Sequence, residues 1–158
     1  MADQYVAIAD YDPAWADRFA EQQVLVEGLL RPWLSRPVEH IGSTSVPGLR
    51  AKPVIDMLAP VGSLDEARAA LPVLADEART HHLHVVEAEH THARALLAFR
   101  DALRVDAGLR REYASVKERL ARQHRDNRNA YTNAKTAFVE RALRRAGIDP
   151  SPRDLLPE

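Results

Sequence analysis

The sequence predicts an α+β domain, because helical and strand patterns alternate in its first half and only helical patterns follow. Two short apolar runs in the first half, 38–41 and 53–60, end at Gly or Pro and indicate strands. After residue 90, apolar residues return at helical spacing in three stretches, at 91–106, 110–124 and 126–147. We therefore expect a mixed sheet with one N-terminal helix and three C-terminal helices.

The first predicted helix begins at Pro13 with Asp12 as its N-cap, because proline is favoured at the first helical position. Aromatic and aliphatic residues follow at helical spacing from Trp15 to Leu30, and the pattern then stops. The strand at 38–41 comes next in the chain. This part of the sequence therefore predicts a helix followed by a strand.

A second helix is predicted after the strand at 53–60, with Ser63 as its N-cap and an end near Arg79. Pro72 falls inside this pattern and should kink the helix or split it in two. The run HLHVVE, at 82–87, indicates a third strand, and the three C-terminal helices follow it.

Composition limits the classes of function. The chain has 22 Lys and Arg residues against 23 Asp and Glu residues, so no bulk charge favours nucleic acid or a membrane surface. Cysteine is absent, which excludes disulfides and thiolate metal sites. We see neither a signal-peptide pattern nor an apolar run of about 20 residues. We expect one cytoplasmic domain over residues 1–150, with 151–158 as a frayed tail.

The stretch EHIGSTSVPGLRAKPVIDM, residues 39–57, predicts a site for a phosphate group. Gly42 lets the backbone turn sharply and approach a ligand closely. Hydroxyl groups follow directly, on Ser43, Thr44 and Ser45. The amide groups of such a turn can cradle phosphate oxygens. Asp56 should return beside the turn as a candidate catalytic residue, where its carboxylate can hold Mg²⁺ against the phosphate.

This stretch resembles the signature of the GrpB-like family, which is placed in the nucleotidyltransferase superfamily by its fold. The chain matches later blocks of the family in order, with HLHVVE, FRDALR, REYASVKERLA and AYTNAKTAFVE. The similarity covers residues 11–140. It implies a nucleotidyltransferase-like mixed sheet with appended helices, but no firmly established activity. GrpB-like domains also occur fused to dephospho-coenzyme A kinase, which implies a link to coenzyme A or nucleotide metabolism.

The chain departs from these patterns in two places. Active nucleotidyltransferases resemble Gly-Ser followed by Asp-x-Asp and a third acid, because two metal ions need several carboxylates. Here Leu58 stands two positions after Asp56, so one carboxylate of the pair is missing. The connection ahead of His81 is also shorter than in typical GrpB-like chains, and we expect a missing hairpin to open or simplify one wall of the cleft.

Further candidate ligands lie on the neighbouring predicted strand. His82 and His84 project from one face of it, about 6.5 Å apart, and could chelate Zn²⁺ with Asp56 as a third ligand. The alternative is that one of these histidines packs as a core residue. Lys52, just before the second strand, could meet a phosphate or could simply be solvated.

One face of the last helix presents Tyr131 and Lys135, which are four residues apart. These side chains could cover the cleft by stacking on a base and contacting a phosphate. The alternative is a packing aromatic beside a lysine that reaches to solvent.

The leading hypothesis is a nucleotidyltransferase-like protein that binds a nucleotide or another phosphorylated small molecule with a divalent metal. In this hypothesis it could transfer a nucleotidyl group through Asp56. The first alternative is a non-catalytic module of degenerate fold that binds a ligand or a protein. The second is a metal-dependent phosphohydrolase that uses His82, His84 and Asp56.

Overall fold

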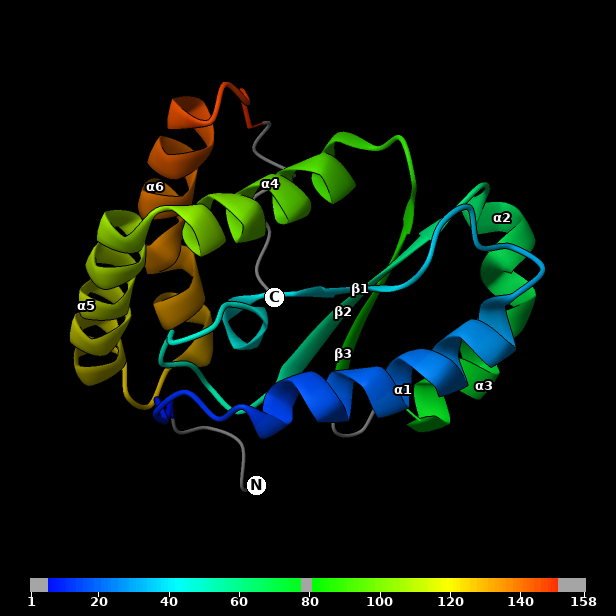
Figure 1. The fold of residues 1–158 in the computed structure, drawn as a ribbon, viewed down its shortest axis with the longest axis horizontal. Coiled ribbons are helices and arrows are strands. Elements are labelled where there is room, and N and C mark those ends of the chain that lie inside the picture. Colours follow the sequence, from blue (N-terminus) through cyan, green and yellow to red (C-terminus); the bar gives the residue numbers. More distant parts are fainter. Residues whose placement is uncertain (1–5, 78–80, 151–158) are drawn as a thin grey trace.

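The structure is a computed structural model that describes residues 6–77 and 81–150, so the expected tail at 151–158 lies outside the described residues. Within this part of the chain the strands form one sheet in the order β1 (Glu39–Ile41), β2 (Ile55–Val61) and β3 (His81–Glu87). β1 pairs with β2 antiparallel and β3 pairs with β2 parallel (Figure 1). The predicted mixed sheet is therefore confirmed.

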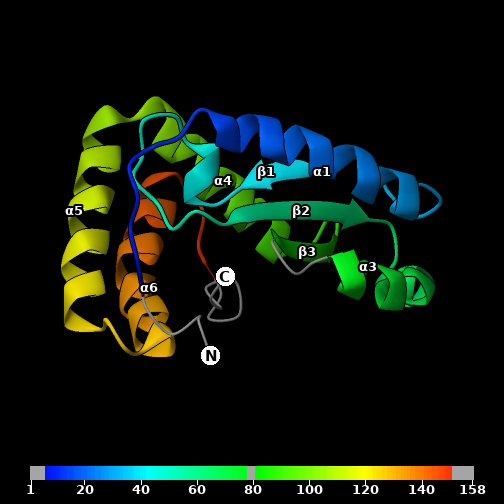
Figure 2. The same cartoon turned by 90° about the horizontal axis from the view of Figure 1, so that it is seen from below.

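Helix α1 (Ala14–Leu30) covers one face of the sheet, as Figure 2 shows. It begins one residue later than predicted, with Pro13 as its N-cap, and the Asp12 carboxylate accepts a hydrogen bond from the Ala14 amide at 2.9 Å. The side chains that α1 buries against this face pack with alternate residues of β2, in a cluster that includes Trp15, Val26, Leu30, Ile55, Met57 and Ala59. Because strand side chains alternate between faces, Asp56 and Leu58 must lie on the other side of the sheet.

The segment between β2 and β3 is the helix that Pro72 was predicted to kink or split. It consists of α2 (Leu64–Ala67), a 3₁₀ turn η2 (Arg68–Ala70) and α3 (Leu71–Glu77), with Pro72 in the first turn of α3. Ser63 caps α2, since its hydroxyl accepts from the Glu66 amide at 3.4 Å. A crossover of this kind is what lets two consecutive strands run parallel.

The three C-terminal helices are α4 (Thr91–Val105), α5 (Ala107–Gln123) and α6 (Arg128–Arg145). Asp106 and Asn127 cap α5 and α6 with their side-chain oxygens. α4 packs on the second face of the sheet over Ile41 and Leu58. α5 and α6 stand beyond one end of the sheet (Figures 1 and 2). Within residues 6–77 and 81–150, no helix combines the length and apolarity that crossing a membrane takes.

Candidate functional site

The second face of the sheet carries a polar pair where it approaches α6. Asp56 and His82 are register partners on β2 and β3. The His82 Nδ1 atom lies 3.0 Å from Asp56 Oδ1, and its Nε2 atom lies 3.3 Å from Arg128 Nη2 at the start of α6. An arginine can only donate, so His82 Nε2 accepts and the Nδ1–H donates to Asp56. A connected chain of hydrogen bonds therefore runs from β2 to α6.

Gly42 lets the Asp56 carboxylate approach the backbone. The strand register pairs Ile41 with Asp56, which puts this carboxylate beside the turn, as expected. Gly42 has a φ of 71°, and a Cβ atom placed on it would lie 2.5 Å from Asp56 Oδ2. Glycine is needed here because of both the left-handed backbone and the lack of space. The sequence analysis assigned this close approach to the ligand, whereas in the structure it is made by a side chain of the protein.

Two of the three predicted hydroxyl groups hold the turn itself. The turn is a short 3₁₀ segment, η1 (Ser43–Ser45). The Ser45 hydroxyl donates to the Gly42 carbonyl at 2.5 Å, and the Thr44 hydroxyl donates to the Val54 carbonyl at 3.1 Å. Both side chains are buried. Of the three predicted hydroxyl groups, the structure therefore leaves that of Ser43 as the candidate for contacting a ligand.

His40 on β1 supports the turn from within. Its Nε2 atom lies 3.0 Å from the Thr44 hydroxyl, which receives the hydrogen bond because its own proton goes to Val54. The ring stacks on Phe19 of α1, with centroids 4.6 Å apart. Burial, and then the positive charges of Arg104 and Arg100, lower the pKa of His40 to about 4. His40 is therefore a neutral structural histidine near pH 7.

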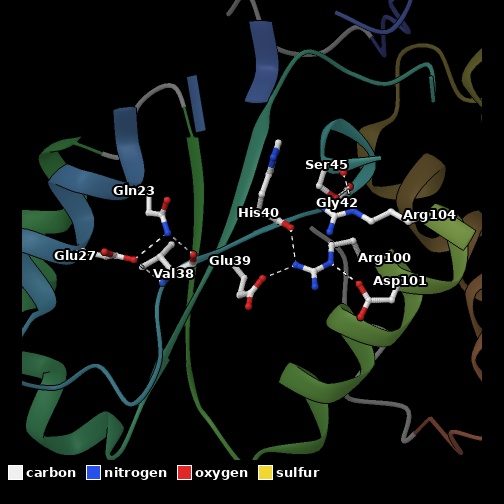
Figure 3. Close-up of polar contacts among 10 residues, drawn as sticks. All are labelled: Gln23, Glu27, Val38, Glu39, His40, Gly42, Ser45, Arg100, Asp101 and Arg104. Carbon is white, nitrogen blue, oxygen red and sulfur yellow. Dashed lines mark hydrogen bonds and ion pairs between the residues drawn. The ribbon is translucent and has the colours of Figure 1, made fainter. Parts of the chain in front are cut away.

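Two arginines of α4 hold β1 and the turn, and we call them with their acceptors the arginine clamp. Arg100 donates to the Glu39 carboxylate at 2.7 Å and to the His40 carbonyl at 3.1 Å, and it also pairs with Asp101 at 2.9 Å. Arg104 donates to the Ser45 carbonyl at 3.0 Å. Figure 3 shows both guanidinium groups reaching from α4 to this segment.

On the opposite side of β1, α1 holds the residue before the strand in a similar way. The Glu27 carboxylate accepts from the Val38 amide at 2.9 Å, and Gln23 donates to the Val38 carbonyl at 3.0 Å. These contacts also appear in Figure 3. The segment that leads into the turn is therefore fixed from both sides, which makes the position of Gly42 and Asp56 a property of the scaffold.

A small basic pocket lies between the Asp56–His82 pair and the C-terminal helices. Its basic lining residues are Lys52, Lys117, Arg128 and Lys135. Ser43, Thr44, His82, Tyr131 and Thr132 also line it, and Asp56 is the one carboxylate among its described lining residues. The cavity is about 40 Å³, which is room for a few water molecules or one tetrahedral oxyanion. Four basic groups against one acid make it electropositive.

The basic groups of α5 and α6 are positioned by aromatic rings. Lys117 is only 2% exposed, its ammonium group donates to the Arg50 carbonyl, and it lies 4.8 Å from the centre of the Tyr113 ring. The Lys135 ammonium group lies 4.7 Å from the centre of the Tyr131 ring. Such cation–π contacts place a positive charge without cancelling it.

Lys117, Arg128 and Thr132 also line the pocket and were not among the predicted site residues. Arg128 and Thr132 share a face of α6 with Tyr131 and Lys135, because they lie at positions i, i+3, i+4 and i+7. Extending the predicted Tyr131–Lys135 face by one turn would have found Arg128. For Lys117 the signal was its place on the buried stripe of α5, a position that normally takes an apolar residue.

The structure does not gather the three predicted zinc ligands. Among the residues it describes, no group of three or more His, Asp or Glu side chains is placed to hold a metal ion. His84 pairs in register with Leu58, and its ring centre lies 6.3 Å from that of His92. The basic pocket offers one carboxylate, already bonded to His82, among four basic groups. This donor set fits Mg²⁺ poorly, because Mg²⁺ prefers several oxygen ligands.

Comparisons with known proteins agree with the resemblance in the sequence. The profile of the GrpB protein family matches residues 5–77 and 72–145. A UPF0157 protein of Pseudomonas aeruginosa is 35% identical, over 91% of this chain and 69% of that protein. The UPF0157 protein YqkA of Bacillus subtilis is 32% identical over 87% of this chain, which spans 46% of that longer relative.

These matches also bear on the short connection before β3. The two segments that match the family overlap at residues 72–77, in α3 just ahead of that connection. The alignment with the P. aeruginosa protein runs over 170 residues, more than the 158 of this chain, so the relative carries additional residues. The overlap of the two matched segments lies next to the connection that was expected to be short.

A solved structure extends the comparison to the fold. The crystal structure of conserved protein GrpB from Enterococcus faecalis is 30% identical and superposes with a TM-score of 0.80. The match covers 89% of this chain and 96% of that one. With the family profile spanning both the sheet and the C-terminal helices, the chain belongs to the GrpB protein family.

Proposed function

We propose that this protein binds a phosphorylated small molecule and holds its phosphate group in the basic pocket. The observation that carries the proposal is the charge of the lining, four basic side chains against one carboxylate around a cavity of about 40 Å³. A phosphate group compensates this charge and offers acceptor oxygens to every donor in the lining.

The proposal gives each element a role at the phosphate. Arg128 presents a planar fork of donors, which suits two phosphate oxygens at once. Lys117 and Lys135 supply compact charges from α5 and α6, and Lys52 does so from the segment ahead of β2. Ser43 offers its hydroxyl from the turn. Thus α5, α6, the turn and the segment ahead of β2 would each contribute at least one donor.

The rest of the ligand would extend outside the enclosed cavity, because a nucleotide is much larger than one phosphate group. A nucleotide or a coenzyme A precursor stays our first candidate, as the nucleotidyltransferase-like resemblance implies. The functional link to dephospho-coenzyme A kinase, the cytoplasmic location and the divalent metal stay predictions. Binding without transfer is the second candidate, favoured by the single carboxylate, since two-metal nucleotidyl transfer needs several carboxylates.

A thermal-shift series tests the proposal. The probes are inorganic phosphate, nucleoside mono-, di- and triphosphates and dephospho-coenzyme A, each with MgCl₂ and with EDTA. We expect at least one of them to raise Tm, because a ligand at about 100 times its Kd adds about 2.7 kcal/mol to the stability of the native state.

The matched variants are Lys135→Gln in the pocket and Arg119→Gln, an exposed basic residue on α5 outside the pocket. The Tm shift should shrink in Lys135→Gln and stay unchanged in Arg119→Gln. A panel in which no phosphorylated compound shifts Tm under either condition would contradict the proposed function.

A further inference from the structure

We infer that the basic pocket takes a terminal phosphate monoester directly through its lysine and arginine side chains, with no divalent cation between phosphate and protein. This inference rests on the proposed function and defines the ligand more narrowly. It differs from what the superfamily resemblance implies, where an acid holds a metal ion against the phosphate. The contacts of Asp56 and the charges around it carry the inference.

Both carboxylate oxygens of Asp56 already have close neighbours within the protein. Oδ1 accepts the hydrogen bond from His82 Nδ1 at 3.0 Å. Oδ2 lies against Gly42, so close that a Cβ atom there would be 2.5 Å away. Asp56 is only 6% exposed. The carboxylate thus serves the contact between β2, β3 and the turn, and a metal ion would have to compete for it.

The hydrogen bonds that link Arg128, His82 and Asp56 all point from the arginine toward the carboxylate. Asp56 accepts from His82, and His82 accepts from Arg128, so the chain holds the guanidinium group at the mouth of the Asp56–His82 pair. Arginine has five N–H donors in a fixed fork, and this contact uses one of its nitrogens. The chain therefore orients Arg128 as an anion-binding group.

A divalent cation in the basic pocket would meet an excess of positive charge. It would share a small pocket with the side chains of Lys52, Lys117, Arg128 and Lys135. The same groups attract a phosphate dianion. A metal-bridged phosphate needs a site with excess acid, whereas this pocket has excess base, so direct binding is the arrangement that its charges favour.

The size and charge of the cavity also select the class of phosphate. A terminal monoester has three non-bridging oxygens and a charge near −2 at neutral pH. It enters a narrow cavity from one side only. A phosphate diester has two such oxygens, carries one charge and brings a substituent on each side. A cavity of about 40 Å³ with four basic groups therefore favours the monoester.

Isothermal titration calorimetry tests the inference with inorganic phosphate, AMP and 3′,5′-cyclic AMP, each in EDTA and in MgCl₂. We expect the Kd values of phosphate and AMP to agree within about twofold between the two conditions. We expect the cyclic diester to bind at least about tenfold more weakly than AMP. A strict requirement for Mg²⁺, or equal binding of the diester, overturns the inference.

Two variants distinguish direct from metal-bridged binding by whether the Kd for phosphate rises or falls. Asp56→Asn removes a negative charge beside the phosphate and keeps an oxygen that can accept from His82. Direct binding predicts a Kd in EDTA that is lower by up to about fivefold, whereas metal-bridged binding predicts a loss of affinity of about tenfold or more. Arg128→Gln should weaken phosphate binding at least about tenfold in both buffers.

The controls distinguish failure of the inference from failure of the proposed function. Arg119→Gln changes an exposed basic residue outside the pocket and should leave the Kd unchanged. If Asp56→Asn does not fold, the Kd of the native chain in EDTA and in MgCl₂ still shows whether phosphate binding needs a metal ion. Binding that appears only with Mg²⁺ overturns the inference alone, and no binding in either buffer overturns the proposed function as well.

Discussion

The C-terminal helices direct basic side chains toward the segment 39–56 at two places, and the two places differ in what they meet. In the arginine clamp, Arg100 finds the carboxylates of Glu39 and Asp101 as well as a backbone carbonyl. In the basic pocket, the four basic groups share one carboxylate, and their other contacts include aromatic rings and an imidazole. Arg100 of the clamp thus meets two carboxylates, whereas the described lining of the pocket holds four basic groups and one carboxylate.

This difference shows which basic residues serve the fold and which serve a ligand. Two opposite charges about 4 Å apart gain about 4 kcal/mol at the effective dielectric constant of a protein surface. The clamp keeps only part of this attraction as stability, because its carboxylates are partly exposed to solvent, and it holds the turn in place. An anion in the pocket would meet the excess of basic groups in its described lining.

The largest effect is expected at Gly42, which lies between the clamp and the pocket. In Gly42→Ala the new Cβ atom would be 2.5 Å from Asp56 Oδ2, in a backbone conformation with φ of 71°. We expect a loss of about 3–4 kcal/mol in the free energy of unfolding, measured by urea denaturation. Phosphate affinity should fall as well, because Asp56 and His82 must move.

Gly28 provides the matched control. It lies within α1, and a Cβ atom on it would meet nothing within 4 Å. Gly28→Ala should therefore leave stability unchanged or raise it by up to about 1 kcal/mol, because alanine is the better helix former. Equal effects of the two substitutions would show that the contact between Gly42 and Asp56 does not matter.

Much of the fold follows from local chemistry that can be read along the chain. The break around Pro72 and the three strands depend on a few adjacent residues, and the structure confirms them, while the first helix begins one residue later than predicted. The placement of Asp56 beside the turn could also be predicted, because the segment 42–54 brings the second strand back beside the first.

The site was harder to predict, because it depends on contacts between distant segments. Thr44 and Ser45 look like ligand-binding hydroxyls in the sequence, but their acceptors are backbone carbonyls that only the folded turn supplies. Lys117 looks like a solvated lysine until α5 packs against the segment after the turn. The sequence gives no direct sign that Arg100 faces two carboxylates while Arg128 faces an imidazole.

Arg100→Gln tests the structural role of the arginine clamp. It removes the contacts to Glu39, to the His40 carbonyl and to Asp101. We expect a loss of about 2–3 kcal/mol in stability, since a half-buried carbonyl and a carboxylate lose their partner. The Kd for phosphate, measured by calorimetry well below Tm, should stay within about twofold of the native value.

Arg94→Gln is the control on the same helix, because the Arg94–Glu89 pair is exposed. It should cost less than about 0.5 kcal/mol. If Arg100→Gln instead weakened phosphate binding as strongly as Arg128→Gln, the division into a structural clamp and a binding pocket would be wrong.

The smallest expected effect is a pH dependence of folding stability that comes from His40, beside the arginine clamp. Because burial, Arg104 and Arg100 lower the pKa of His40 to about 4, the unfolded chain binds more protons than the folded chain between pH 6.5 and about 4. Stability from this group is complete above pH 6.5 and declines as the pH falls toward 4. Allowing for solvent screening, the loss is about 2 kcal/mol.

Urea denaturation of native protein and His40→Gln at pH 7, 6 and 5 measures this effect. Glutamine can still donate to the Thr44 hydroxyl but does not titrate, so the difference in stability between the two proteins should shrink as the pH falls. Parallel stability curves would mean that His40 gains a proton as readily in the folded chain as in the unfolded one. In that case the positive charges of Arg100 and Arg104 would be cancelled at His40 by Glu39 and Asp101, and the clamp would be even more fully compensated than its contacts indicate.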